Sequence, residues 1–299
     1  MRVDPNYVVK LAAAVDQSSN LENTLTSELS SGLSVNTLQD NPVAVAQSAL
    51  LGSSIAVKDS YIQSASGTQA MLQVTDSTLA EVVTQLTSGV ALSVQGNGGT
   101  LSATNLATIG QQLTSIRDQV LSLANTSYLG NYLFSGSQGS VKPFTVNSTT
   151  TPATTSYAGD SAVQFIQTPS GQQIQTNLPG TAIFGTGSTG VFAALNNLIA
   201  DFSSGTVGAS AASDSAALTS ALSQVTSQRS ILDNSLSRVQ ATSTYVQTDV
   251  AQLTVQQNAL VAADPASVAT QLKSAETQHQ ALLAVINALG STDLFSYMK

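Results

Sequence analysis

His279 is the side chain of this sequence whose ordinary pKa best suits acid–base or metal chemistry near neutral pH, and it is the one histidine among 299 residues. It falls on the apolar stripe of a helix expected near the C-terminus. The sequence has no cysteine and no second histidine that could complete a common metal set with it. We therefore interpret His279 as a packed or interfacial side chain rather than as a ligand or a base.

The acidic and glycine-rich segments give no stronger chemical signal. Asp76 and Glu81 are five residues apart, which does not place two carboxylates on one face of a helix. The segment 96–99 is rich in glycine but lacks the lysine and the preceding strand of a phosphate-binding loop. Residues 157–160 end in an aspartate, yet nothing near them supplies the other oxygens of a calcium site. We predict no enzymatic activity, no catalytic residue, no cofactor and no metal site.

Basic residues are few, and two of them stand out. Arg229 and Arg238 flank Asp233. An ion pair within one helix would explain this arrangement, and lateral contacts between subunits would also explain it. The other basic residues are dispersed, so we expect no basic patch for nucleic acid or anionic lipid. They are Arg2, Lys10, Lys58, Arg117, Lys142, Lys273 and Lys299.

The composition is typical of surfaces that become buried against other chains. Only 9% of the residues are charged, against the usual quarter, and the formal net charge is −8. Uncharged polar residues and alanine take the place of the missing charges. The absence of cysteine excludes disulfides and fits a chain that meets an oxidising exterior unfolded. The sequence contains no stretch of 18 apolar residues, so we expect no membrane-spanning segment. Residues 1–6 lack the apolar core of a cleaved secretion signal, so we expect no such signal.

The strongest pattern is a seven-residue repeat of aliphatic side chains, which predicts one long helix over 214–260 with a seam for partner helices. Half of the positions between them are polar, which favours a helix in a bundle with changing neighbours over a two-stranded zipper. The aliphatic seam consists of Leu218, Val225, Leu232, Val239, Val246, Leu253 and Leu260. The positions between are Leu222, Arg229, Leu236, Ser243, Val250 and Gln257.

Further helices are expected on both sides of a central segment. Apolar spacing predicts helices over 7–33, 42–94 and from 104 to near Asn125, another near 191–198, and a last one from Val268 to its expected cap at Gly290. Asp40-Asn41-Pro42 is typical of a helix start. Between 130 and 190, short alternating runs and a Pro-Ser-Gly turn at 169–171 predict strands.

The fold class that follows is mainly α: an elongated multi-helix rod or coiled-coil bundle built from both chain ends, with a small β-rich inserted outer domain. The expected domains are a terminal coiled coil (1–41 with 262–299), a helical rod (42–129 with 191–261) and the outer domain (130–190). The helices expected at the two chain ends each have an apolar stripe, but a single chain offers little else that could bury these stripes.

Several segments resemble the bacterial flagellin superfamily. Leu29-Ser-Ser-Gly-Leu-Ser-Val-Asn36, followed by Asp40-Asn41-Pro42, resembles its N-terminal motif, with Asn41 where a second acid is usual. Arg229-Ser-Ile-Leu-Asp-Asn234 and Leu236-Ser-Arg238 resemble its C-terminal segment. Details of the insert and of the tail resemble the hook–filament junction branch, hook-associated protein 3, more than filament flagellin. These details are Asn131–Ser137 with Pro143-Phe144, Tyr157–Asp160, Asn177–Gly180 with Phe184, and Leu294–Met298.

The resemblance implies a structural subunit of the bacterial flagellum, outside the cell, exported without a cleaved signal through the flagellar type III apparatus. Its implied partners are copies of itself, the first hook-associated protein on the hook side, flagellin on the filament side and an export chaperone. The resemblance also implies that the terminal coiled coil is disordered until assembly. The terminal helices are then expected to form the assembly interface. Its residues would be Leu11, Val15, Leu25, Leu272, Leu282, Ile286 and Leu289.

Two alternatives remain open at this point. The chain could be flagellin itself, the filament subunit. It could also be a secreted binding protein or an enzyme. An adhesin should carry ligand-facing aromatic side chains in the insert, and the insert offers Phe144, Tyr157, Phe165 and Phe184.

Overall fold

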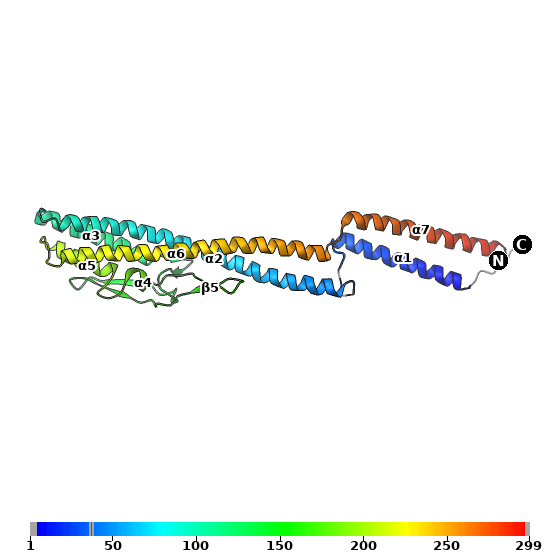
Figure 1. Cartoon of the computed structure of the whole chain (residues 1–299), viewed down its shortest axis with the longest axis horizontal. Coiled ribbons are helices and arrows are strands. Elements are labelled where there is room, and N and C mark those ends of the chain that lie inside the picture. The colour runs from blue at the N-terminus through cyan, green and yellow to red at the C-terminus, as the bar shows by residue number, and fades with distance from the viewer. Residues whose placement is uncertain (1–4, 36, 38, 297–299) are drawn as a thin grey trace. The chain divides into compact units, whose positions relative to one another are not determined.

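A computed structural model of the chain describes residues 5–35, 37 and 39–296, and it is predominantly helical with a small inserted region of strands (Figure 1). The predicted fold class is confirmed. The helices are α1 (Pro5–Ser31), α2 (Pro42–Gly96), α3 (Ala103–Ala124), α4 (Gly180–Phe184), α5 (Val191–Ser203), α6 (Ala211–Val261) and α7 (Pro265–Ser296). The strands are β1 (Ser127–Tyr128), β2 (Asn131–Tyr132), β3 (Phe144–Asn147), β4 (Thr154–Tyr157), β5 (Phe165–Gln167) and β6 (Gln173–Gln175).

The chain divides into two compact units. The terminal unit comprises residues 1–57 and 248–299, and the insert unit comprises residues 58–247. The sequence analysis placed the corresponding boundaries at 41/42 and 261/262. The first turns of α2 and the last turns of α6 thus group with the chain ends, and the domain boundaries themselves stay a prediction.

Helix ends follow local chemistry with one exception, at Gly290. Gly32 has a φ of +72°, and its N–H donates to the Glu28 carbonyl at 2.8 Å, which ends α1. The Asn41 side chain accepts from the Ala44 N–H at 3.0 Å, so α2 begins where the Asp-Asn-Pro step predicted. The expected cap at Gly290 is wrong, because α7 continues to Ser296. A glycine weakens a helix by about 1 kcal/mol without ending it.

Helix α3 ends at Ala124, in agreement with the end expected near Asn125. Asn125 turns the chain out of the helix because its amide donates to the carbonyls of Leu121 at 2.9 Å and Phe144 at 3.0 Å. Its side-chain oxygen accepts from the Phe144 N–H at 2.9 Å. Asn125 therefore joins the end of α3 to β3.

The core of the insert unit lies where four helices meet. A Cβ added to Gly89 of α2 would lie 3.5–3.7 Å from the side chains of Leu218 on α6, Ile116 on α3 and Leu195 on α5. All three of those side chains are buried. The apolar stripes read from the sequence for α2, α3 and α6 therefore face one common core.

The strands form three separate two-stranded antiparallel pairs, β1–β2, β3–β4 and β5–β6. In β3–β4, Phe144 pairs with Tyr157, and in β5–β6, Phe165 pairs with Gln175. The turn between β5 and β6 contains Gly171 at a φ of +85°, as the Pro-Ser-Gly motif predicted.

Aromatic rings form the centre of the insert. Phe134, Phe144, Phe184 and Phe192 are buried, and neighbouring ring centroids lie 5.2–5.7 Å apart. Tyr157 packs on Phe144 at 4.9 Å and donates from its hydroxyl to the carbonyls of Phe134 and Asp160 at 2.9 and 2.7 Å. The insert segments that carry the resemblance to the junction branch thus meet in one cluster, whereas Met298 of the tail segment lies outside the described residues.

Within the part of the chain that the structure describes, no helix is both long enough and apolar enough to cross a bilayer.

Candidate assembly surfaces

The terminal pair, α1 with α7, is antiparallel and holds a small core. Leu25 on α1 and Val268 and Ala275 on α7 are buried together, with Ala263 and Leu272 partly buried against them. The Ser18 hydroxyl donates to the Ala275 carbonyl at 3.5 Å. Figure 1 shows the two helices side by side. Several large apolar side chains among the described residues of the two helices remain exposed outside this core.

The segments that follow α1 and precede α7 are tied by backbone hydrogen bonds. The Ser34 N–H donates to the Val261 carbonyl at 2.8 Å, and the Ala263 N–H donates to the Gly32 carbonyl at 2.9 Å. Leu33 and Ala262 form an antiparallel bridge. The Leu-Ser-Ser-Gly motif therefore joins the two chain ends within the terminal unit.

His279 lies in this pair, as expected of an interfacial side chain. Its Nδ1 is 3.9 Å from Oε1 of Glu22 on α1. Both side chains are about a quarter exposed. Among the described residues, no group of three or more histidine, cysteine or acidic side chains could hold a metal ion.

The predicted interface residues differ in how far one chain buries them. Leu25 is buried, whereas Leu11, Val15, Leu272 and Leu282 are half-buried. Ile286 is 37% exposed. The side chain of Leu289 lies outside the described residues. Further large apolar side chains of this pair are exposed: Val9, Leu21, Leu29, Leu283 and Val285.

The aliphatic seam of α6 is buried over most of its length. Leu218, Val225, Leu232, Val239 and Val246 are buried, and Leu253 and Leu260 are half-buried. Two of the polar positions between them, Arg229 and Gln257, have partners on α2. The Gln257 amide donates to the carbonyl and hydroxyl oxygens of Ser48 at 3.1 and 3.3 Å. Arg229 forms an ion pair with Asp76.

Arg229 holds Asp76 of α2 with two hydrogen bonds, from Nε at 2.6 Å and from Nη2 at 3.2 Å. These bonds lower the pKa of the Asp76 carboxyl and raise the pKa of Arg229. Burial and the charge of Asp76 raise the pKa of Asp233. The ion pair expected within α6 is thus replaced by one between helices of the same chain.

Arg238 stands apart from this pair. Its Nη2 donates to the Gln173 carbonyl at 3.4 Å in an exposed position. It joins α6 to β6, and its role in lateral contacts between subunits stays a prediction, as does that of Arg229.

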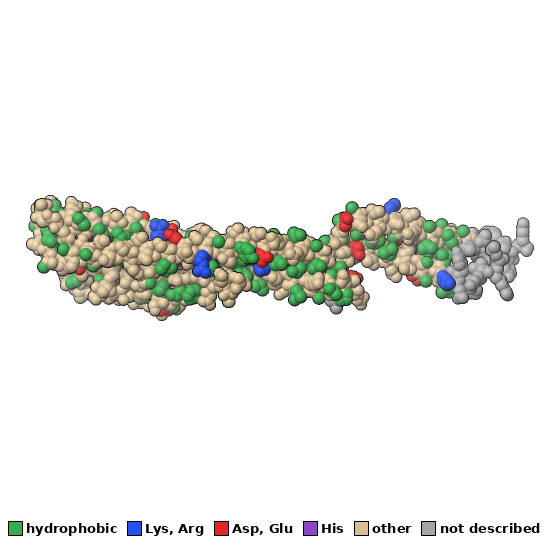
Figure 2. Space-filling model, in the orientation of Figure 1, with side chains coloured by type: hydrophobic (Ala, Val, Ile, Leu, Met, Phe, Trp, Pro, Cys, Tyr) green, Lys and Arg blue, Asp and Glu red, His purple; other side chains and the backbone are tan. Residues whose placement is uncertain are grey.

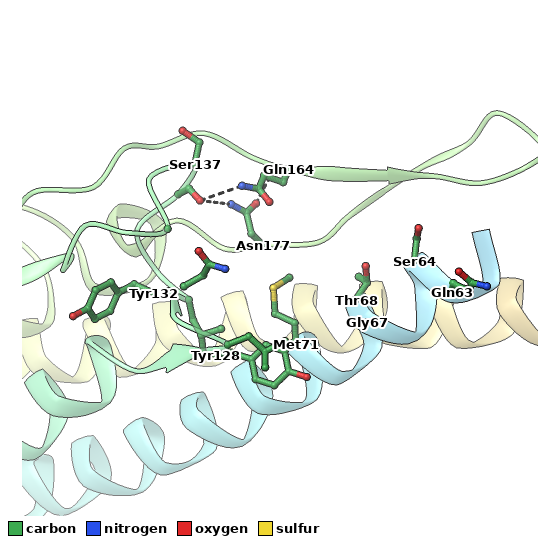
Figure 3. Close-up of a pocket in the computed structure, with 15 residues that line it drawn as sticks. Gln63, Ser64, Gly67, Thr68, Met71, Tyr128, Tyr132, Ser137, Gln164 and Asn177 are labelled. Carbon is green, nitrogen blue, oxygen red and sulfur yellow. Dashed lines mark hydrogen bonds between the residues drawn. The ribbon is translucent and has the colours of Figure 1, made fainter. Parts of the chain in front are cut away.

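A cavity of about 560 Å³ lies between α2 and the insert (Figure 3). Gln164 and Asn177 close one side of it, and their amides donate to the Gly136 carbonyl at 3.4 and 3.3 Å. Met71 of α2 and Tyr128 of β1 lie on the other side. Among the described residues, no charged side chain lines the cavity, so its lining offers shape and amide hydrogen bonds rather than acid–base chemistry.

The sequence analysis missed one exposed surface on α2. Val43, Leu50 and Val57 are all exposed. Their seven-residue spacing was the signal that could have found them. The same helix also carries a buried apolar stripe, and the sequence pattern alone did not separate the two.

The comparisons with known proteins agree with this architecture. Residues 7–139 match the family model of the bacterial flagellin N-terminal helical region. Over 118 residues, the chain is 30% identical to flagellar hook-associated protein 3 of Salmonella typhimurium and 29% identical to that of Escherichia coli. Each match covers 39% of this chain and 37% of the relative's length.

A solved structure resembles most of the chain. Flagellar hook associated protein-3 from Legionella pneumophila superposes with a TM-score of 0.63 at 13% identity, covering 71% of this chain and 98% of that one. The fold is therefore that of this class of flagellar proteins. The resemblance to the bacterial flagellin superfamily, and within it to hook-associated protein 3, is confirmed.

Proposed function

We propose that the chain is a structural subunit of the bacterial flagellum that joins hook to filament as a hook-associated junction protein and assembles helically with its own copies. The observation that carries the proposal is the terminal pair. Its core consists of Leu25, Val268 and Ala275, while larger apolar side chains on both helices stay exposed. A two-helix unit of this kind becomes stable by packing against further helices.

The exposed apolar residues of the pair suit heterologous contacts, in which one face of a subunit meets a different face of the next. Such contacts do not close on themselves and generate a tube. In the proposal, residues 1–41 with 262–299 form the innermost layer, the helices of 42–129 with 191–261 make the lateral contacts, and residues 130–190 face outward.

The same architecture would serve flagellin, the filament subunit. The junction assignment is supported by the relatives and by the solved structure, which carry the name hook-associated protein 3. The insert adds a second support, because those of its own segments that resemble the junction branch meet in its aromatic cluster.

The proposed partners are copies of the chain, the first hook-associated protein on the hook side, flagellin on the filament side, and an export chaperone before secretion. The location is extracellular, after export through the flagellar type III apparatus. The role needs no catalytic residue and no cofactor.

Deletion of the gene, followed by analysis of the culture supernatant, tests the proposal. A junction protein predicts that motility is lost, hooks remain, and flagellin is shed as monomer. If hooks with their caps remain and no flagellin is made, the chain is itself the filament subunit. Unchanged motility and intact filaments would refute both roles.

A further inference from the structure

The first turns of α2 carry apolar side chains on two faces. One face packs within the terminal unit: Ala44 is buried and Leu51 and Ile55 are half-buried. The other face carries Val43, Leu50 and Val57, which are 65%, 72% and 61% exposed. A helix that is apolar on both sides is usually buried on both sides.

The spacing and the surroundings of this second face indicate what covers it. The three side chains repeat every seven residues, which is the spacing that packs against another helix. From residue 42 to 57 the sequence contains no charged residue. A helix lying on a membrane surface carries Lys or Arg along its polar face, and a nucleic-acid surface needs the same charges. The occupant is therefore an uncharged helix face.

This chain itself supplies such faces. In the terminal unit, Val255 of α6 is exposed among uncharged neighbours, and α7 exposes Leu283 and Val285 in a run without charge from 280 to 292. Charged side chains are likewise few and scattered on the face shown in Figure 2. The exposed face of α2 and these exposed faces of α6 and α7 all lack charge, so no unpaired charge would be buried if they packed together.

The size of this face indicates whether it could hold two chains together on its own. Sixteen helical residues extend about 24 Å, and three aliphatic side chains cover much less than the roughly 800 Å² per partner of a stable pairwise interface. A contact this small holds only where many copies are kept together. We infer that Val43, Leu50 and Val57 form a docking stripe for a helix of a second copy of this chain, an inference that rests on the proposed structural role and specifies one of its contact surfaces.

Photo-crosslinking in the full chain tests the inference. Benzoylphenylalanine replaces Leu50 in one strain and Ala49 in a control strain. Ala49 is also exposed but is turned by about 100° around the helix. Flagellar assemblies and whole cells are irradiated, and adducts are identified by mass and by peptide mapping. The expected adduct at position 50 has twice the mass of the chain, joins a helix of a second copy, and exceeds that at position 49 severalfold.

Substitution provides an independent measurement. A glutamate buried in an uncharged contact is costly, so Leu50→Glu should reduce the amount of chain retained in assemblies by about tenfold or more. Ala49→Glu and Leu50→Ile should each retain it within about twofold. Helical content by circular dichroism should be unchanged in all three, because both positions are exposed.

Each other outcome overturns the inference. Equal adducts at both positions, an adduct with a different polypeptide, or full retention of Leu50→Glu would remove the second copy as the occupant. If the chain is absent from flagellar assemblies, the proposed function fails. The adducts from whole cells then still show whether Leu50 meets a second copy.

Discussion

The guanidinium of Arg229 on α6 clamps the carboxylate of Asp76 on α2 through two nitrogens, and this ion pair occupies a polar position of an otherwise aliphatic seam. The two residues are 153 positions apart in the sequence. The arginine side chain is 34% exposed and the aspartate side chain 25% exposed, so solvent screens the pair only in part. The pair fixes how α2 and α6 are aligned along each other within the insert unit.

A double-mutant cycle of Asp76→Asn and Arg229→Gln should give a coupling energy of about 1–2 kcal/mol, because a bidentate and partly buried ion pair exceeds the usual surface value. Urea unfolding followed by circular dichroism measures it. The matched control is Lys273 with Glu276, an exposed pair on α7 at 3.2 Å, whose coupling should be near zero. Equal coupling in both cycles would contradict this account.

Acid should weaken the insert unit through Asp76. Its folded pKa is lowered below 3.8 by the hydrogen bonds from Arg229, so its contribution to stability is present above that value and is lost as the pH falls through the folded pKa. Unfolding free energies measured from about pH 3 to about pH 7 should fall less steeply toward acid in Asp76→Asn than in the parent chain. Identical acid slopes would refute the assignment.

Asp233 should have the opposite effect. Burial and the charge of Asp76 raise its folded pKa above 3.8, so its ionisation costs stability as the pH rises through that folded pKa. Asp233→Asn should therefore stabilise the chain near neutral pH, and the gain should vanish in acid below 3.8. The same urea titrations report both effects. A variant that is destabilised at neutral pH would show that Asp233 supports the ion pair rather than competing in it.

The residues of the α6 seam should contribute unequally to the free energy of unfolding. Leu232→Ala should cost about 2–4 kcal/mol of unfolding free energy, because its side chain is 2% exposed and its removal leaves a cavity. Leu253→Ala should cost about half as much or less in the isolated chain, since Leu253 is only half-buried. Comparison by thermal and urea unfolding decides the order. A larger cost at Leu253 would mean that the terminal unit is packed more tightly than the structure shows.

Charges on the apolar side of α7 should block assembly without blocking export. Leu282→Asp with Ile286→Asp should give a secreted, soluble monomer that does not join the flagellum, because each carboxylate would enter an apolar contact. The control is Gln280→Asp with Ala284→Asp, which places the same charges on the other face of α7. Supernatant and filament fractions report the result. Normal filament growth by the first variant would exclude α7 as an assembly helix.

The insert should depend on one hydroxyl. Tyr157→Phe keeps the ring that packs on Phe144 and removes the donor to the carbonyls of Phe134 and Asp160. The loss of both bonds should cost about 1–3 kcal/mol. Phe165→Leu is the matched control, because Phe165 is 54% exposed and should tolerate the change. Proteolysis of the insert distinguishes the two variants.

Periodicity predicted the helices well because each long helix buries one stripe. The prediction for α6 was 214–260 and the structure has Ala211–Val261, and for α2 it was 42–94 against Pro42–Gly96. The turn at 169–171 and the start of α2 followed from residues that act on their immediate neighbours. The end of α3 at Asn125 was predicted, but the bonds of Asn125 to β3 were not. The error at Gly290 arose because a helix can continue through a glycine.

Partners across the fold could not be derived from spacing alone. The polar positions Arg229 and Gln257 signalled an imperfect seam, but their partners Asp76 and Ser48 lie far away in the sequence. The exposed stripe at Val43, Leu50 and Val57 has the same seven-residue spacing as a buried one. Only burial in the folded chain separates a stripe that faces the core from one that remains available.

The scarcity of charge determines how the proposed contacts between subunits respond to salt. Screening by salt weakens exposed ion pairs over a Debye length of about 8 Å at physiological ionic strength, and it hardly affects apolar contacts. A chain in which 9% of the residues are charged, and whose exposed stripes are aliphatic, has little for salt to screen. Contacts between such surfaces would keep their strength at low and at high salt concentration. Contacts made of exposed ion pairs would weaken as the salt concentration rises.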